Sequence, residues 1–173
     1  MIDRYYAGIG SRETPDVVIR SMKEIAAFLR STHILRSGGA GGADSAFESA
    51  AGDNKQIFLP YDGFNGRKVD DKQYFILTGD VEKKAKLLAA KYHPNWSRCG
   101  FAAKRFHTRN MAQVLGPELN SMVEFVVCYT EGGKLVGGTA QAIRVAKDHK
   151  IPIFNLGKMS MTDVLYFLQD YVK

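Results

Sequence analysis

Three glycine-rich clusters each stand between a short β-branched or aromatic run and an amphipathic segment. They occupy residues 8–12, 37–44 and 132–139, and they constrain the fold more than any other feature. In a parallel α/β sheet, turns that lead from a strand into a helix lie at the carboxyl edge, where backbone N–H groups and helix N-termini favour anions. The three clusters are therefore expected to build one composite pocket.

The segments around these clusters alternate between strand and helix patterns. Strands are expected at residues 4–7, 33–36, 56–59, 123–129 and 152–155. Helices are expected at residues 15–30, 42–51 and 138–149, with a last one capped by Ser160 and Asp163. This alternation predicts an α/β, Rossmann-like fold: a mainly parallel central sheet with helices on both faces. Residues 80–116 fit the alternation least and are expected to form a helical insertion, within one domain that spans residues 1–173.

Charge and hydropathy restrict the partners. The net charge of +6 suits an anionic partner, either nucleic acid or a phosphorylated small molecule. Apolar runs such as residues 125–129 are far shorter than the roughly 20 residues that span a bilayer, and the N-terminus lacks the pattern of a secretory signal. A soluble, cytoplasmic protein without a membrane partner is expected. Much of the positive charge lies in one segment: Lys83, Lys84, Lys86, Lys91, Arg98, Lys104, Arg105 and Arg109.

The cysteine and histidine positions indicate neither a disulfide nor a metal site. Cys99 and Cys128 form no Cys-x-x-Cys pair, and His93 and His107 are too isolated in the sequence to argue for a metal. No cofactor is expected either. The first cluster lacks the third glycine of the dinucleotide fingerprint, and the third cluster lacks the lysine of a P-loop.

The three clusters resemble the successive nucleotide-binding motifs of the SLOG superfamily. The resemblance rests on Gly8-Ile9-Gly10-Ser11-Arg12, on Ser37-Gly38-Gly39-Ala40-Gly41-Gly42-Ala43-Asp44 and on Gly137-Gly138-Thr139-Ala140-Gln141. That superfamily includes the DNA-processing protein DprA, the LOG-type phosphoribohydrolases and small phage-encoded DprA-like proteins, to which this chain is most similar. The resemblance implies a Rossmann-like fold that binds a nucleotide, a nucleotide derivative or, as in DprA, single-stranded DNA. For a phage-encoded protein, it also implies a location in the host cytoplasm.

The sequence departs from the enzymes of this superfamily at one position. Where LOG-type hydrolases carry a glutamate that assists cleavage of the N-glycosidic bond, this chain has Ala142, preceded by Gln141. An amide cannot act as an acid or base near neutral pH. If the protein is an enzyme, other carboxylates must act, and the candidates are Asp44, Glu48 and Glu131.

The candidate ligand-binding residues come from the glycine clusters and from nearby cations. Arg12 directly follows the first cluster and can clamp a phosphate, whereas Asp44 is suited to accept hydrogen bonds from ribose hydroxyls. Tyr61, Phe64 and Trp96 are candidates for stacking on a base. The full set of expected ligand-binding residues is Gly8, Gly10, Ser11, Arg12, Ser37, Gly38, Gly39, Ala40, Gly41, Gly42, Asp44, Arg105, Arg109, Thr130, Gly137, Gly138, Thr139, Gln141 and Arg144.

Three functions remain open at this point. The first is binding of a nucleotide or nucleotide-derived molecule without turnover, by a sensor or a sequestering, anti-defence protein. The second is an enzyme, an N-glycosidase or glycosyltransferase. The third is DprA-like binding of single-stranded DNA along residues 83–109, with Arg105 and Arg109 expected on one face of a helix. The sequence also leaves self-association open.

Overall fold

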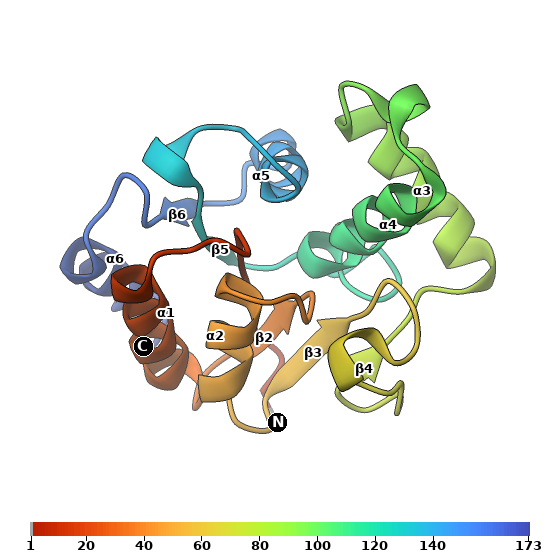
Figure 1. Cartoon of the computed structure of the whole chain (residues 1–173). Coiled ribbons are helices and arrows are strands. Elements are labelled where there is room, and N and C mark those ends of the chain that lie inside the picture. The colour runs from red at the N-terminus through yellow and green to blue at the C-terminus, as the bar shows by residue number, and fades with distance from the viewer. Residues whose placement is uncertain (1) are drawn as a thin grey trace.

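The protein, described by a computed structural model over residues 2–173, is built on a six-stranded sheet in the order β4-β3-β2-β1-β5-β6. All five neighbouring pairs are parallel. The strands are β1 (Tyr5–Gly10), β2 (Ile34–Ser37), β3 (Lys55–Phe58), β4 (Tyr74–Phe75), β5 (Phe125–Tyr129) and β6 (Ile153–Asn155). The predicted Rossmann-like α/β fold is confirmed (Figure 1).

Residues 2–173 also form six α-helices and three short 3-10 turns; all but the last helix, which follows the last strand, lie between strands. The α-helices are α1 (Asp16–Leu29), α2 (Ala43–Ala50), α3 (Gly79–Tyr92), α4 (Phe101–Leu115), α5 (Thr139–Asp148) and α6 (Met161–Leu168). The 3-10 turns are η1 (Phe64–Gly66), η2 (Trp96–Arg98) and η3 (Glu131–Gly133). The predicted cap of α6 is confirmed, because Ser160 Oγ accepts a hydrogen bond from the Asp163 amide at 3.1 Å.

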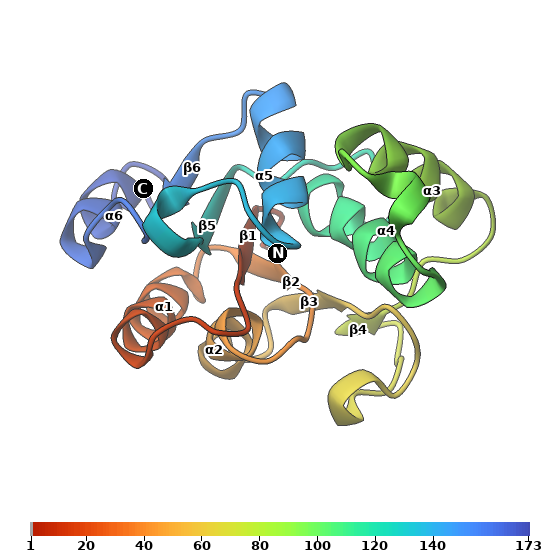
Figure 2. The same ribbon diagram turned by 45° about the horizontal axis from the view of Figure 1, so that its top comes forward.

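The helices form two layers, one on each face of the sheet (Figure 2). Side chains of α1, α2 and α6 pack in one core, and those of α3, α4 and α5 pack in the other. The strands are buried on both faces, so neighbouring residues go to opposite cores: Tyr6 and Phe125 to the first, Ala7 and Val126 to the second. This explains why the central strands read as nearly continuous apolar runs.

The segment expected to be an insertion is a helical hairpin that belongs to the second layer. Helix α3 packs on α4, and α4 in turn contacts α5 and strands β1, β2 and β3. The part of α4 from Thr108 to Leu115 is buried throughout. Strand β4, which precedes the hairpin, was not predicted because two residues carry no alternating pattern.

The sheet reverses its order at β1. The chain runs outward from β1 to β4, then crosses back through the α3–α4 hairpin to place β5 on the other side of β1. The crevice outside the carboxyl ends of two such strands is where ligands bind in open α/β sheets. Here those ends are Gly10 of β1 and Tyr129 of β5, which are paired in register.

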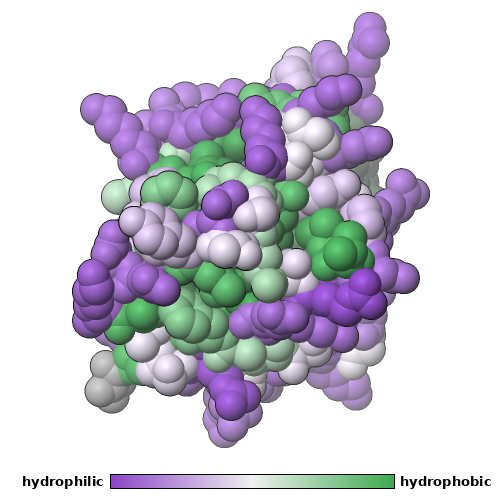
Figure 3. Space-filling view, turned by 90° about the vertical axis from the view of Figure 1, so that its left-hand side faces the viewer, coloured by the Kyte–Doolittle hydropathy of each residue, from purple (hydrophilic) through white to green (hydrophobic). Residues whose placement is uncertain are grey.

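The outer surface is mixed in character. Figure 3 shows hydrophobic side chains among hydrophilic ones on the face that carries α1 and α6, and the exposed hydrophobic residues of these helices are Val17, Phe28, Tyr166 and Phe167. Within residues 2–173, no helix combines the length and the apolar character needed to cross a membrane.

Candidate functional site

A cavity of about 760 Å³ lies at the point where the sheet reverses its order. The ends of β1 and β5, the start of α5, Asp44 of α2 and one face of α4 form its walls. Its volume is within the range of small-molecule sites. The residues that line it are Ile9, Gly10, Ser11, Arg12, Glu13, Pro15, Ala40, Asp44, Ala103, Phe106, His107, Arg109, Asn110, Gln113, Tyr129, Thr130, Glu131, Val136, Gly137, Gly138 and Thr139.

All three glycine clusters contribute to this cavity. The predicted site residues that line it are Gly10, Ser11, Arg12, Ala40, Asp44, Arg109, Thr130, Glu131, Gly137, Gly138 and Thr139. Their meeting follows from the topology, because the carboxyl ends of parallel strands share one edge of the sheet.

Gly8 and Ser37 do not line the cavity, so the structure does not place them with the other predicted ligand-binding residues. A Cβ at Gly8 would lie 2.6–2.8 Å from the Phe47 ring, so this glycine lets α2 approach β1 closely. Ser37 is buried, and its Oγ donates a hydrogen bond to the Gly8 carbonyl at 2.6 Å. Both residues therefore serve packing within the sheet.

The glycines of the second cluster accommodate the protein's own arginine. A Cβ at Gly38 would overlap the Arg109 guanidinium, which also donates a hydrogen bond to the Gly38 carbonyl. Gly39 and Gly42 have φ of +68° and +71°, a region that L side chains rarely adopt. Gly41 is exposed and outside the lining. None of Gly38, Gly39, Gly41 and Gly42 lines the cavity, and Gly39 and Gly42 shape the turn into α2; a close approach of this backbone to a ligand stays a prediction.

Asp44 is a buried carboxyl at the wall of the cavity. Its Oδ2 accepts a hydrogen bond from the Ala40 amide at 3.2 Å. Burial raises the pKa of Asp44 above its ordinary value, whereas Arg109 and the amides of Ala40 and Gly10 act in the opposite direction. The carboxyl thus occupies the N-terminal turn of α2, where an anionic ligand would otherwise bind.

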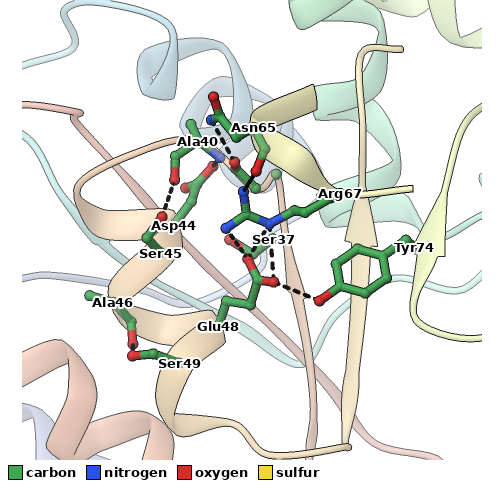
Figure 4. Close-up of polar contacts among 12 residues, drawn as sticks. Ser37, Ala40, Asp44, Ser45, Ala46, Glu48, Ser49, Asn65, Arg67 and Tyr74 are labelled. Atoms are coloured by element: carbon green, nitrogen blue, oxygen red, sulfur yellow. Dashed lines mark hydrogen bonds and ion pairs between the residues drawn. The ribbon is translucent and has the colours of Figure 1, made fainter. Parts of the chain in front are cut away.

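Glu48, the second candidate catalytic carboxylate, does not line the cavity, and Figure 4 shows its carboxylate turned toward Arg67 and Tyr74. Arg67 Nη2 lies 2.7 Å from Glu48 Oε2, and the Tyr74 hydroxyl donates a hydrogen bond to Glu48 Oε1 at 2.9 Å. Burial and this hydrogen bond raise the pKa of Tyr74 to about 12. Glu48 therefore fixes the loop after β3 to α2, and the structure does not place this candidate at the cavity.

The charged residues that line the cavity are Arg12 and Arg109, with the carboxyl groups of Glu13, Asp44 and Glu131. The Arg12 and Arg109 guanidinium carbons lie 5.4 and 5.5 Å from the centre of the Phe106 ring. Arg109 donates hydrogen bonds to the Gly38 and Phe58 carbonyls, and burial lowers its pKa to about 10, which leaves it charged at neutral pH. Within residues 2–173, the structure gives the Arg12 side chain no hydrogen bond or ion pair, so its donors remain available to a ligand.

Three other predicted residues lie outside the main cavity. Gln141 is fully buried: its Nε2 donates to the Ala89 carbonyl at 2.9 Å, and its Oε1 accepts from Asn110. Arg144 lines a neighbouring cavity of about 420 Å³. Arg105 is exposed, and its Nε donates to the Pro60 carbonyl at 3.0 Å. The structure therefore does not bring Gln141, Arg144 and Arg105 into the wall of the main cavity, and a role of theirs in ligand binding stays a prediction.

The inner face of α4 carries the predicted Arg109 and three cavity residues that were not predicted: Phe106, Asn110 and Gln113. Phe106, Arg109, Asn110 and Gln113 line the cavity with the i, i+3, i+4, i+7 spacing of one helix face. Tyr61, Phe64 and Trp96, the expected stacking residues, do not line it. The helical period is the sequence signal that could have identified these residues, because Phe106, Asn110 and Gln113 share a helix face with Arg109. Arg105 falls outside that face.

His93, Cys99 and His107, which fall within one segment of the sequence, have side chains that lie together. Their potential ligand atoms are all within 4.8 Å of one another. The expectation that the two histidines are isolated is therefore wrong. The turn of residues 93–100, which joins α3 to α4, brings them together.

Comparison with known proteins adds to this geometry. No protein-family profile and no curated protein matches the sequence. Among solved structures, DNA processing protein A from Helicobacter pylori, described with its single-stranded DNA binding mode, is similar with a TM-score of 0.53 and 15% identity. The chain shares the fold of DprA. The match covers 99% of this chain and 79% of that one, and DprA from Streptococcus pneumoniae matches with a TM-score of 0.50 and 15% identity over 89% of this chain and 50% of its own.

Proposed function

We propose that the cavity at the β1–β5 edge binds a nucleotide or a nucleotide-derived small molecule. The observation that carries the proposal is the presence, in one cavity, of an unpartnered cation and a buried carboxyl: Arg12 and Asp44 both line it. A bare phosphate would gain from Arg12 but would be repelled by Asp44. A ligand with an anionic group and separate hydroxyl groups, as in a nucleotide, satisfies both.

The anionic end of the ligand is expected near Arg12 and the start of α5. Charge-assisted hydrogen bonds from a guanidinium to phosphate are stronger than neutral ones, and Arg12 has its donors available. Gly138 and Thr139 lie at the N-terminal end of α5 and line the cavity, so their backbone N–H groups add donors. Arg109 of α4 adds positive charge to the cavity wall, while its Nη1 donates to the Gly38 and Phe58 carbonyls.

Binding without turnover is the form of this function that the side chains favour. Glu48 is held by Arg67 and Tyr74, and Gln141 is enclosed in the core. Asp44 and Glu131 are the catalytic candidates left in the cavity. A protein that binds a nucleotide without turnover would serve as a sensor or would sequester its ligand. The N-glycosidase alternative depends on Asp44 and Glu131.

The test combines ligand identification with matched variants. Mass spectrometry of molecules released from the purified protein, followed by thermal shift with a panel of nucleotides, identifies the ligand class. Arg12→Ala and Asp44→Asn should each weaken binding, whereas Arg20→Ala, which removes an exposed arginine of α1, should not. Nucleotides that remain intact after long incubation support binding alone. Free base in excess over protein, lost in Asp44→Asn, would support the enzyme instead, and equal binding by all variants would refute the site.

Single-stranded DNA binding is a second candidate function. It is favoured by the fold shared with Helicobacter pylori DprA and by the exposed cations of α3 and α4. Most of the basic segment is exposed, namely Lys83, Lys84, Lys86, Lys91, Arg98 and Arg105. The two candidates differ in their salt dependence, because DNA binding releases counterions in proportion to the phosphates contacted.

A further inference from the structure

The side chains of His93, Cys99 and His107 form a cluster at the junction of α3 and α4. His93 follows the last residue of α3, Cys99 follows η2, and His107 lies two turns into α4. The Cys99 Sγ is 3.7 Å from both ring nitrogens of His93, and the His93 and His107 ring centres are 4.3 Å apart. All three residues are half-buried, so the cluster is shielded but reachable from solvent.

The spacing agrees with tetrahedral coordination. Bond lengths of about 2.3 Å for Zn–S and about 2.0–2.1 Å for Zn–N place the ligand atoms of a tetrahedral site about 3.3–3.6 Å apart. The ligand atoms of the cluster lie within 4.8 Å of one another, and Cys99 Sγ is 3.7 Å from both His93 nitrogens, so binding requires the cluster to contract and the His93 ring to turn one nitrogen toward the metal. Imidazole and thiolate are the ligand types that zinc prefers.

His107 is prepared as a ligand by its contact with Gln141. Gln141 Nε2 donates to the Ala89 carbonyl, which leaves Oε1 as the acceptor for His107 Nδ1 at 2.9 Å. Nδ1 therefore carries the hydrogen, and Nε2 keeps the lone pair. Metal-binding histidines are commonly oriented by such a second hydrogen bond.

His93 also keeps a nitrogen lone pair. Its Nδ1 accepts a hydrogen bond from the Asn95 amide at 3.1 Å. Asn95 is exposed, so this amide can bond to water when a metal takes the lone pair. The Cys99 thiol, which lies 3.6 Å from the Asn95 carbonyl, would lose its proton on binding.

From these contacts we infer that His93, Cys99 and His107 bind one divalent transition-metal ion of the zinc type. Three protein ligands leave a fourth position, as in zinc sites that keep an exchangeable water. His93 and His107 line the cavity of about 420 Å³ that also contains Arg144, and His107 lines the main cavity as well. The fourth position is thus placed for water or for an anionic oxygen of a molecule bound nearby. The inference does not depend on nucleotide binding.

The test uses Co²⁺ as the probe on the full chain without an affinity tag, after dialysis against a chelator. One equivalent of Co²⁺ should give a thiolate-to-cobalt absorption band, and Zn²⁺ should abolish it. Cys99→Ser should remove the band. His93→Gln should weaken Co²⁺ affinity at least about tenfold, since even residues that only orient metal ligands contribute about 10–100-fold. His149→Gln changes an exposed histidine outside the cluster and is the matched control.

A second measurement uses the wild-type chain, so that the inference can be tested even if a variant fails to fold. In the wild-type chain, Zn²⁺ should slow the alkylation of Cys99, whereas Cys128 stays unreactive because burial raises its pKa to about 12. The inference is overturned if Co²⁺ gives no saturable thiolate band and Zn²⁺ leaves the alkylation rate unchanged. It is also overturned if His149→Gln reduces binding as much as His93→Gln does.

Discussion

Arg67 holds Glu48 through its Nε, 2.8 Å from Glu48 Oε2, and through its Nη2, 2.7 Å from the same oxygen. The pair is mostly buried, with side-chain exposures of 17% for Arg67 and 9% for Glu48. It connects α2 to the loop after β3, so its role is structural. A carboxylate committed in this way cannot also act on a ligand.

Glu48→Gln is therefore expected to lower stability and to preserve ligand binding. Loss of one charge from a largely buried pair costs about 1–3 kcal/mol. Urea unfolding measures the change, with Glu118→Gln, at an exposed position, as the control. If Glu48→Gln has normal stability but no longer binds nucleotide, Glu48 contacts the ligand and the structural role is refuted.

Substitutions at Gly138 and at Gly38 are expected to have different effects, one on ligand binding and the other on stability. A Cβ at Gly138 meets no atom within 4 Å, and this residue lines the cavity. Gly138→Val should fold normally and lose the nucleotide-induced stabilisation, which for ligand at 100 times Kd is about 2.7 kcal/mol. Gly41→Val is the control, because a Cβ at Gly41 also meets no atom within 4 Å but Gly41 does not line the cavity.

Gly38→Ala should instead destabilise the protein, since its Cβ would overlap Arg109. Full ligand stabilisation in Gly138→Val would contradict the assignment of the cavity.

His33 predicts a dependence of stability on pH. Burial lowers the pKa of His33 in the folded state, against a smaller opposing effect of Glu124. Because the unfolded chain then binds more protons, the contribution of His33 is present above about pH 6.5 and is lost as pH falls through the folded pKa. Each such histidine changes the unfolding free energy by at most about 1.4 kcal/mol per pH unit.

We expect the melting temperature of the wild type to fall between pH 7.5 and pH 5.5 more than that of His33→Gln. Comparing the two proteins cancels the contributions of Asp44, His107 and the other groups that both contain. His149→Gln, at an exposed position, should behave like the wild type. An equal pH effect in the wild type and in His33→Gln would refute the prediction.

Exposed cations of α3 and α4 should govern DNA binding without affecting mononucleotide binding. Each phosphate contact on single-stranded DNA contributes about 0.7 to the slope of log affinity against log salt. The double variant Lys86→Ala with Arg105→Ala should reduce that slope by about 1.4 if both residues contact phosphates. Arg20→Ala with Lys23→Ala, on the opposite layer, is the control. The expected outcome fails if the α1 pair changes the slope as much, or if mononucleotide binding falls with the α3–α4 pair.

Sequence alone determined the architecture, because its signals are local. Apolar runs followed by glycines and amphipathic helices specify parallel strands joined by helices, and parallel strands necessarily bring their carboxyl ends to one edge. The meeting of Gly10, Asp44 and Gly138 at one cavity follows from that rule. The Ser160 cap of α6 was equally readable, since it depends on residues three positions apart.

Only the tertiary structure decided what each side chain does at that edge. The partner of Glu48 is Arg67, 19 residues away, and the partner of Gln141 is His107, 34 residues away. Which face of α4 turns inward depends on how the α3–α4 hairpin packs on the sheet, so Arg109 entered the cavity and Arg105 did not. The same hairpin gathered His93, Cys99 and His107. Contacts between distant segments are set by packing, and a single sequence carries no local signal for them.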